Sequence, residues 1–582
     1  MATSIDSVPA RRTKVEACRH NIRENGLHWY YFLFFIALGL VMVVAGVLTG
    51  VQYSKKHNIS MYGMVLDGGS VHTTVILYQW KGAKLNGTGE VDEIFSCEIG
   101  STNGISSFTE SPGDVDGYLL DNRHDGESCI EKATSMINYR SSVDKELFRN
   151  KSTVFLGATG GMRVLNDTDP EIAQEILCDV SNSLCKIGLK QPAHKCGLAK
   201  IISGKKEAKL GWVTVNYLLR HLQTEKESFA NSKNMKKDME NPSEIGALDW
   251  GGASSQITFP VDTTTPIGPL VEDVTFFNRT TRIFTTSHIC YGQAEALNRY
   301  FVHLIYQEFL KTGKIQTILK SPCQPDSKSR INSISARGLL TRCTKLADKA
   351  FEDLFDKMNR NTVFKFEAKN DIQTCKELID SQFDMSNCTV TYASEDVCLD
   401  SRIIPKAKVG TKFLAFSTYW YVVDELGDKL MANKNDAGIL VQSSIFKSVV
   451  ESLCSEKAEN HSLLSLGNEK VQNSCFRALY MQTLLFKGYK FNDWNDIRFV
   501  STIHGQTVGW TLGYMLQETN KYRSILQTET YTVMDRFTFF IIALFILMGL
   551  CLIILAISQV IGKIPGTFKQ GETSLLDNSE ES

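Results

Sequence analysis

The chain has almost no net charge. Its 582 residues include 63 lysines and arginines and 64 aspartates and glutamates, which gives a formal net charge of −1 at pH 7. The composition therefore does not indicate nucleic acid or any other strongly charged partner. The sequence also lacks short-period repeats and low-complexity tracts, so it does not indicate a repeat protein. A chain of this length predicts two or more compact units.

Two segments, residues 29–51 and 537–561, contain no charged side chain at all. At ~1.5 Å per residue, a helix over either one spans the ~30 Å hydrocarbon core of a bilayer. The first exceeds the ~7–15 apolar residues of a cleaved signal peptide, so an uncleaved anchor is favoured over cleavage. Because arginines and lysines are concentrated before the first segment, both tails (residues 1–28 and 562–582) are predicted to be cytosolic. A multi-pass protein of the plasma membrane is therefore predicted, with an internal secretory membrane as the alternative.

Two features of the region between the spans agree with a secretory or extracellular location. Thirteen of the 15 cysteines lie there, a density that predicts disulfides in an oxidising compartment. Because thirteen is odd, one thiol is expected to be free or to pair elsewhere. The sequons for N-glycosylation also lie in this region, at Asn58, Asn86, Asn150, Asn166, Asn278, Asn387 and Asn460.

Strand-like and helical patterns alternate between the spans. Residues 61–69 and 72–80 are typical of strands, and residues 152–165 of a strand that ends in a turn of small residues. Amphipathic helices are predicted over residues 211–223 and 292–313, the second ending at Gly313. Residues 224–243 are polar and predict an exposed loop or a junction between lobes. The alternation predicts an α/β ectodomain.

Two of the predicted strands end in an aspartate followed by glycines, at Asp67-Gly-Gly-Ser and Asp249-Trp-Gly-Gly. Glycine allows backbone N–H groups to approach an anion closely, and such turns bind phosphate. An aspartate beside them is suited to a hard cation such as Mg²⁺ or Ca²⁺. A single Asp-Gly is equally typical of a hairpin. Two of them, about 180 residues apart, favour a two-lobed nucleotide clamp.

Five segments then occur in the order typical of one family. They are DGGSVHTT (67–74), GATGGMR (157–163), ISGKKEAKLGWVTVNYLL (202–219), DWGGASSQ (249–256) and GWTLGYML (509–516). On these segments the chain resembles the ecto-nucleoside triphosphate diphosphohydrolases (ecto-apyrases) of the cell-surface type. The resemblance implies two RNase H-like lobes, as in actin, Hsp70 and sugar kinases, between the two membrane helices. Lobe 1 would comprise residues 52–223, completed by about 501–530, and lobe 2 residues 224–500.

The resemblance also implies a role for each motif residue. Glu207 would be the general base, and Ser254 and Gln256 would position the attacking water, with Thr159 nearby. Ca²⁺ or Mg²⁺ would be held through water by Asp67 and Asp249. The implied phosphate-binding residues are Gly68, Gly69, Ser70, His72, Gly160, Gly251, Gly252 and Ala253. Without the resemblance, Glu207 would be read as a solvated carboxylate at a helix start and His72 as a histidine on a strand surface.

Further assignments come from shorter matches. The nucleobase would stack on Tyr421, with Trp420 as the second choice, and Lys487 would cover its opposite face; stacking tolerates any base. The implied disulfides are Cys97–Cys129, Cys290–Cys343, Cys323–Cys375, Cys388–Cys398 and Cys454–Cys475, which leaves Cys178, Cys185 and Cys196 unassigned.

The chain departs from the family pattern in three ways. Val71 replaces a serine in the first phosphate turn. Ala208 follows Glu207 where glycine is usual, and would be strained by ~1–2 kcal/mol if the backbone there had positive φ. Lys206 and Lys209 flank Glu207 and are expected to lower the pKa of its carboxyl.

The implied function is extracellular hydrolysis of ATP, ADP, UTP and UDP to monophosphates, which would control nucleotide signalling. The departures around Glu207 keep an alternative open, a weakly active or inactive nucleotide-binding ectodomain that acts as receptor or scaffold. A kinase or chaperone on the same clamp is disfavoured by the outward topology. Gly46 and Gly50 form a small-xxx-small pattern, which predicts helix association and homo-oligomers.

Overall fold

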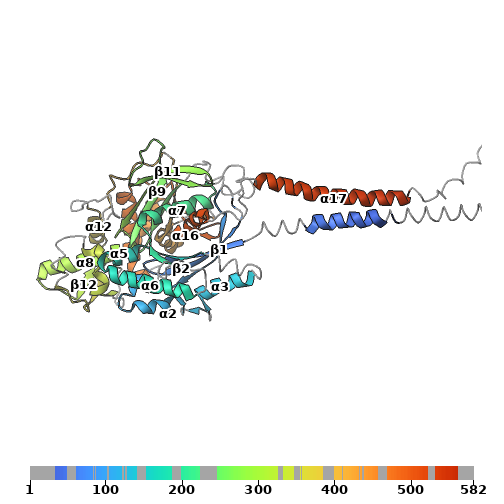
Figure 1. The fold of residues 1–582 in the computed structure, drawn as a ribbon. Helices are drawn as coiled ribbons and strands as arrows, with labels where there is room; N and C mark the ends of the chain where they lie inside the picture. Colours follow the sequence, from blue (N-terminus) through green and yellow to red (C-terminus); the bar gives the residue numbers. More distant parts are fainter. Residues whose placement is uncertain are drawn as a thin grey trace, which may run out of the picture. The chain divides into compact units, whose positions relative to one another are not determined.

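The computed structural model describes most of the chain between residues 60 and 521 and two helical segments outside it (Figure 1). It divides into two compact units, residues 60–524 and residues 1–59 with 525–582. The described residues are 30, 33–48, 60–82, 84, 87–100, 104–120, 123–124, 127–140, 153–186, 198–222, 245–324, 332–345, 354, 357–384, 399–408, 410–430, 433–435, 438–455, 468–521 and 531–561.

The first large sheet has five strands in the order β3-β2-β1-β6-β7. Strand β1 pairs antiparallel with β2 and parallel with β6, so the sheet is mixed. The interior of β1 is almost entirely buried, because helices cover both faces of the sheet. Helices α2, α3 and α6 build a core on one face, and α16 contacts the sheet from the other. The bounds are β1 Ser60–Gly68, β2 Thr73–Lys81, β3 Val91–Ile99, β6 Thr153–Ala158, β7 Ala199–Ile201, α2 Val115–Leu120, α3 Cys129–Arg140, α5 Gly160–Thr168, α6 Pro170–Lys186 and α16 Trp510–Lys521.

The second large sheet has eight strands in the order β10-β11-β9-β8-β15-β18-β17-β16. Its central strands β8, β15 and β18 are parallel, and its flanks are antiparallel. Aromatic side chains from β8, β9 and β15 pack with those of α8, α13 and α15 in the largest core of the molecule. The bounds are β8 Gly246–Trp250, β9 Ser254–Pro260, β10 Val271–Phe276, β11 Arg279–Ile289, β15 Phe413–Ser417, β16 Asn433–Asn435, β17 Gly438–Leu440, β18 Ile497–Phe499, α8 Gln293–Thr312, α13 Thr418–Leu426, α14 Ser443–Ser455 and α15 Asn468–Thr483.

Helix α7 (Gly204–Leu218) lies between the two sheets (Figure 1). It contacts β8, β9 and β11 of the second sheet and packs along α16, which covers the first. Gly513 permits this close approach, because a Cβ there would lie 2.1 Å from the carbonyl oxygen of Leu210. The helix begins seven residues before the predicted start at residue 211, and its first turn includes Glu207. The predicted helix ending at Gly313 is confirmed as α8, which Gly313 caps in the left-handed conformation.

The remaining elements form small sheets and short helices at the periphery. They are β4 Arg123–His124, β5 Glu127–Ser128, β12 Ile318–Ser321, β13 Asn332–Ser335, β14 Val363–Ala368, β19 Thr502–Ile503, β20 Gln506–Thr507, α9 Ala336–Leu339, α10 Arg342–Lys345 and α12 Ile372–Ser381. Together the elements form an α/β fold with mixed sheets. The predicted lobe boundaries remain a prediction.

The second unit contains helical residues 33–48 and α17 (Tyr531–Ile561). A Cβ on Gly46 would lie 2.8 Å from Ile546 Cγ1, so this glycine packs against α17 of the same chain. Gly50, its partner in the predicted oligomer contact, lies outside the described residues. Among the residues that the structure describes, no helix combines the length and apolarity required to cross a membrane.

Four of the five implied disulfides are present in the structure: Cys97–Cys129, Cys290–Cys343, Cys323–Cys375 and Cys454–Cys475. The fifth, Cys388–Cys398, lies outside the described residues. Cys178, which had no assigned partner, is also disulfide-bonded. Two sequon residues, Asn166 and Asn278, are described and both are exposed. The other sequons, at Asn58, Asn86, Asn150, Asn387 and Asn460, lie outside the described residues.

Candidate active site

The two Asp-Gly turns of the sequence meet in the structure. The first follows β1 of the five-stranded sheet, and the second follows β8 of the eight-stranded sheet. A Cβ on Gly252 would lie 2.9 Å from Ser70 Cβ, and one on Gly160 would lie 2.9 Å from Ala253 Cβ. These distances are shorter than ordinary van der Waals contacts, so only glycine allows the turns to approach so closely.

The carbonyl groups of Gly251 and Gly252 in the second turn face the start of α8. The N–H groups of Gln293 and Ala294, at the start of α8, donate to the carbonyl oxygens of Gly251 and Gly252 at 2.9 and 2.8 Å. In a trans peptide the next N–H points opposite to the carbonyl. The N–H groups of Gly252 and Ala253 therefore point away from α8, as a phosphate-binding turn requires.

Three buried carboxyl groups lie close enough to affect one another's ionisation. Burial raises the pKa of Asp67 to about 8, and the charge of Glu207 adds to this rise. Burial and the same Glu207 charge raise the pKa of Asp249 to about 7. The indole of Trp510 beside Asp67 and the Ser417 side chain beside Asp249 partly oppose these rises. The cluster therefore carries more negative potential than the protein itself compensates.

Arg163, the last residue of the GATGGMR segment, connects the carboxylate Glu207 to the second turn. Its Nη1 donates to Glu207 Oε2 at 2.8 Å and its Nη2 donates to Ser254 Oγ at 2.8 Å. Glu207 and Arg163 are 8% and 7% exposed, so the pair is shielded from water and each group depends on the other. Sequence analysis gave Arg163 no role.

Gln256 contacts the same carboxylate and is hydrogen-bonded to Ser254. Gln256 Nε2 donates to Ser254 Oγ at 2.7 Å and lies 3.3 Å from Glu207 Oε2. Gln256 Oε1 is buried and accepts no hydrogen bond within the described part of the chain. This amide oxygen, the Ser254 hydroxyl and Glu207 can together orient a water molecule by both of its protons.

Thr159 fixes the end of the first turn. Its N–H and its hydroxyl both donate to the carbonyl oxygen of Gly68, at 3.0 and 3.2 Å. On the opposite sheet, Ser417 holds a backbone φ of 59° beside Asp249. A non-glycine residue in this region is strained, and such strain is concentrated at functional sites. Nothing in the sequence pattern distinguishes Ser417, which sequence analysis therefore missed.

The carboxylate pair fits a divalent cation held through water. Asp67 Oδ1 is buried without a hydrogen-bond partner among the described residues. Burial and the charge of Glu207 raise the pKa of both Asp67 and Asp249, and a cation bound between them would oppose this rise. No cluster of three or more His, Cys, Asp or Glu side chains able to chelate a metal occurs in the described ranges. Two aspartates with intervening water therefore suit Ca²⁺ or Mg²⁺, which keep water ligands.

A model of the GDA1/CD39 (nucleoside phosphatase) family matches residues 53–530. The chain belongs to this family. It is 30% identical over 491 residues to ectonucleoside triphosphate diphosphohydrolase 1 of Mus musculus, covering 83% of this chain and 85% of that protein. It is 30% identical over 500 residues to ectonucleoside triphosphate diphosphohydrolase 3 of Homo sapiens, covering 84% of each. A solved structure of nucleoside triphosphate hydrolases from Neospora caninum shares the fold, with a TM-score of 0.55, 14% identity and coverage of 85% of this chain and 98% of that one.

The structure describes the surroundings of two departures from the nucleoside phosphatase pattern. Ala208 lies inside α7 and has no positive φ, so the expected strain is absent and alanine suits the helix. Lys209 Nζ donates to Glu272 Oε2 at 2.8 Å, and Lys206 Nζ lies 5.3 Å from the centre of the Tyr514 ring. Both lysines therefore contact groups other than Glu207, and Arg163 lies in contact with its carboxylate. The expectation that the lysines lower the pKa of Glu207 stays a prediction.

The remaining implied ligand residues lie nearer the surface. His72 Nε2 is 3.9 Å from Glu98 Oε1. Tyr421 is 42% exposed on α13, and burial followed by the charge of Glu98 raises the pKa of its hydroxyl. Lys487, in the π-helical turn Leu484–Gly488, pairs with Asp380 at 2.7 Å. The roles of these residues in nucleotide binding stay predictions.

The contact between the turns gives a first prediction. In Gly252→Ala, the new Cβ would lie 2.9 Å from Ser70 Cβ and 3.1 Å from Val71 Cγ2, so the turns must separate. A 1 Å misplacement can cost about 10²-fold in rate, and we expect a loss of about tenfold in kcat. The measurement is phosphate release from ATP. Gly268→Ala, whose Cβ meets nothing within 4 Å, is the control, and equal activity of the two variants would contradict the prediction.

Proposed function

We propose that this chain hydrolyses nucleoside tri- and diphosphates (ATP, ADP, UTP and UDP) to monophosphates and phosphate, by direct attack of water and with Ca²⁺ or Mg²⁺. The observation that carries the proposal is that Gln256 bonds both Glu207 and Ser254, while the charge of Glu207 acts on the buried Asp67 and Asp249. Membership of the nucleoside phosphatase family supports the same chemistry.

In this proposal each residue of the candidate active site has one role. The two glycine turns bind the phosphates through backbone N–H groups, and Asp67 and Asp249 hold the hydrated cation. A bound divalent cation would neutralise charge on the transferred phosphoryl group. Gln256 Oε1 and Ser254 hold the water in line. Glu207 takes its proton as the water oxygen bonds the terminal phosphorus and the P–O bond to the departing nucleotide breaks. Arg163 keeps Glu207 oriented through its 2.8 Å hydrogen bond.

We further propose that residues 52–530 form two RNase H-like lobes, anchored by membrane helices at residues 29–51 and 537–561 and located outside the cell. The disulfides and the exposed Asn166 and Asn278 support this location. In this arrangement the nucleobase stacks between Tyr421 and Lys487 at the cleft edge, and the enzyme limits the lifetime of extracellular nucleotide signals.

The experiment is phosphate release from ATP, ADP and UDP by intact cells that express the chain, with and without a chelator of divalent cations. We expect monophosphate as the final nucleotide and complete loss of release in chelator. The helical backbone at Ala208, which has no positive φ, removes one of the reasons for the alternative of a receptor or scaffold. That alternative would be supported if nucleotide binds and no phosphate is released.

A pH prediction follows from the raised pKa values of about 8 for Asp67 and about 7 for Asp249. Between about pH 4 and about pH 8 the folded, metal-free chain binds more protons at these carboxyls than the unfolded chain, so this contribution to stability is lost as pH rises. We expect Asp67→Asn to raise the Tm of the metal-free protein near pH 8, and to change it little near pH 4. Added Mg²⁺ should stabilise the wild type near pH 8 and the variant much less. A Tm for Asp67→Asn below that of wild type in chelator near pH 8 would contradict the prediction.

A further inference from the structure

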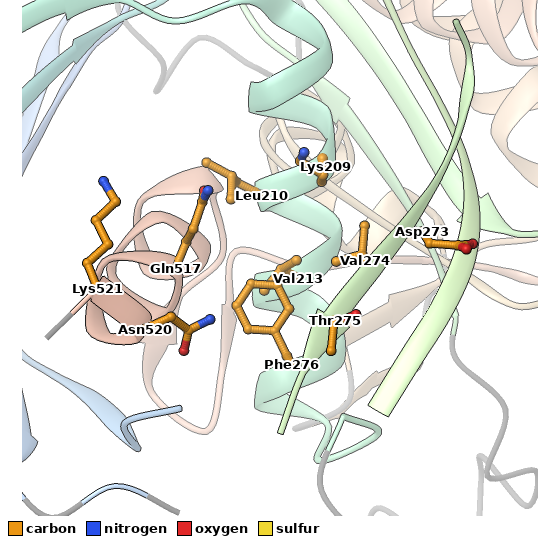
Figure 2. Close-up of a pocket in the computed structure, with 10 residues that line it drawn as sticks. All are labelled: Lys209, Leu210, Val213, Asp273, Val274, Thr275, Phe276, Gln517, Asn520 and Lys521. Carbon is orange, nitrogen blue, oxygen red and sulfur yellow. The ribbon is translucent and has the colours of Figure 1, made fainter. Parts of the chain in front are cut away.

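A cavity of about 390 Å³ lies between α7, β10 and α16 (Figure 2). It is separate from the carboxylate cluster. Lys209 follows Glu207 by two positions, so the two side chains leave α7 about 200° apart. The lining residue Gln517 lies about two helical turns beyond Trp510 on α16. The lining consists of Lys209, Leu210, Val213, Asp273, Val274, Thr275, Phe276, Gln517, Asn520 and Lys521.

Apolar groups form one side of the cavity and carboxamides the other. Leu210, Val213 and Phe276 are buried, and Figure 2 shows the Phe276 ring beside Val213, with Asn520 from α16 near it. Gln517 Oε1 is buried and makes no hydrogen bond in the described part of the chain. A buried amide oxygen without a donor is costly, and a ligand with an N–H group would satisfy it.

The charged groups around the cavity are already paired. Lys209 Nζ is 2.8 Å from Glu272 Oε2, Lys521 Nζ is 2.5 Å from Glu518 Oε1, and Asp273 bonds Arg282 at 2.7 Å. Figure 2 shows the Asp273 carboxylate pointing away from the other lining side chains. No charged lining group is therefore left to compensate an anion, which disfavours a nucleotide and favours an uncharged ligand.

We propose that this cavity is a second binding site, for an uncharged planar heterocycle that carries an N–H donor, as a nucleoside does. The size is within the ~300–1,000 Å³ range of small-molecule sites. The carboxamides of Gln517 and Asn520 match the donor and acceptor edge of such a ring, as Asn and Gln do with adenine. The Phe276 ring and the valines provide the apolar surface for its faces. An occupant would touch both α7, which carries Glu207, and α16, which carries Trp510.

The test is equilibrium dialysis of labelled adenosine against the full-length chain in detergent. We expect saturable binding at one site, weakened at least about tenfold by Gln517→Leu, which keeps the approximate shape and removes the amide. Asn520→Leu, at an exposed position, is the second variant, with little risk to folding, and should weaken binding similarly. Tyr421→Ala and Glu207→Gln should leave it unchanged.

Two results would overturn the proposal. One is the absence of saturable adenosine binding at millimolar concentration, measured on protein that is shown to be folded because it hydrolyses or binds ATP. The other is binding that is lost in Tyr421→Ala and retained in both Gln517→Leu and Asn520→Leu, which would place adenosine in the catalytic cleft. Neither result bears on whether the chain hydrolyses nucleotides, so the proposed function and this site fail independently.

Discussion

Replacing Glu207 by glutamine is expected to lower kcat for ATP and ADP by roughly 10²–10⁴-fold while nucleotide still binds. Glutamine has the shape of glutamate and can accept the hydrogen bond that Arg163 donates at 2.8 Å, but it cannot take a proton from water. The measurements are steady-state phosphate release and equilibrium binding of nucleotide. The variant is expected to fold, since the buried arginine keeps an acceptor.

Glu295→Gln is the matched control for this experiment. Glu295 is 9% exposed, close to the 8% of Glu207, and its carboxylate accepts from Thr341. Burial raises the pKa of this carboxyl, and glutamine keeps an acceptor for Thr341, so activity should be kept. If Glu207→Gln were as active as Glu295→Gln, Glu207 would not be the base. If wild type and Glu207→Gln bound nucleotide and were equally inactive, the receptor or scaffold alternative would stand.

Replacing Arg163 by methionine is expected to destabilise the folded protein by about 3–5 kcal/mol, because it leaves a buried carboxylate without its cation. Asp67 and Asp249 also lie near Glu207 and make its isolated charge more costly. Thermal unfolding of the full-length chain in chelator measures the loss. Hydrolysis should also fall, since both Glu207 and Ser254 lose a hydrogen bond of 2.8 Å.

The double variant Arg163→Met with Glu207→Gln separates the ion pair from general packing. With the charge of Glu207 removed, much of the lost stability should return. The deviation of the two substitutions from additivity should exceed the ~0.3–0.5 kcal/mol that is usual for distant sites. Arg163→Lys should be intermediate, because lysine keeps the charge but lacks the planar fork that reaches both partners. Purely additive effects would show that the pair is not coupled.

Features that depend on a few consecutive residues could be predicted from the sequence, whereas contacts between distant segments could not. The turns after Asp67 and Asp249 and the helix ending at Gly313 are recognisable from short segments, whereas the four described disulfides were implied only by the family resemblance. The environment of Glu207 is not, because its partners lie 44 and 49 residues away in sequence. Lys206 and Lys209 lie within two positions of Glu207 in the sequence. Their side chains point away from it because a helix distributes consecutive side chains around its axis. The strained backbone of Ser417 likewise depends on the pairing of β15 with β8.

The Cys290–Cys343 bond has a practical consequence for obtaining active material. Cys290 donates its N–H to Ala253 at 2.8 Å and lies three residues before the α8 amides that hold the second turn. Synthesis in a reducing cytoplasm would therefore yield protein without the disulfide that links Cys290, beside the second turn, to Cys343. Secretory expression hosts, or refolding with a thiol–disulfide couple, are the appropriate routes to preparations for kinetics and crystallography.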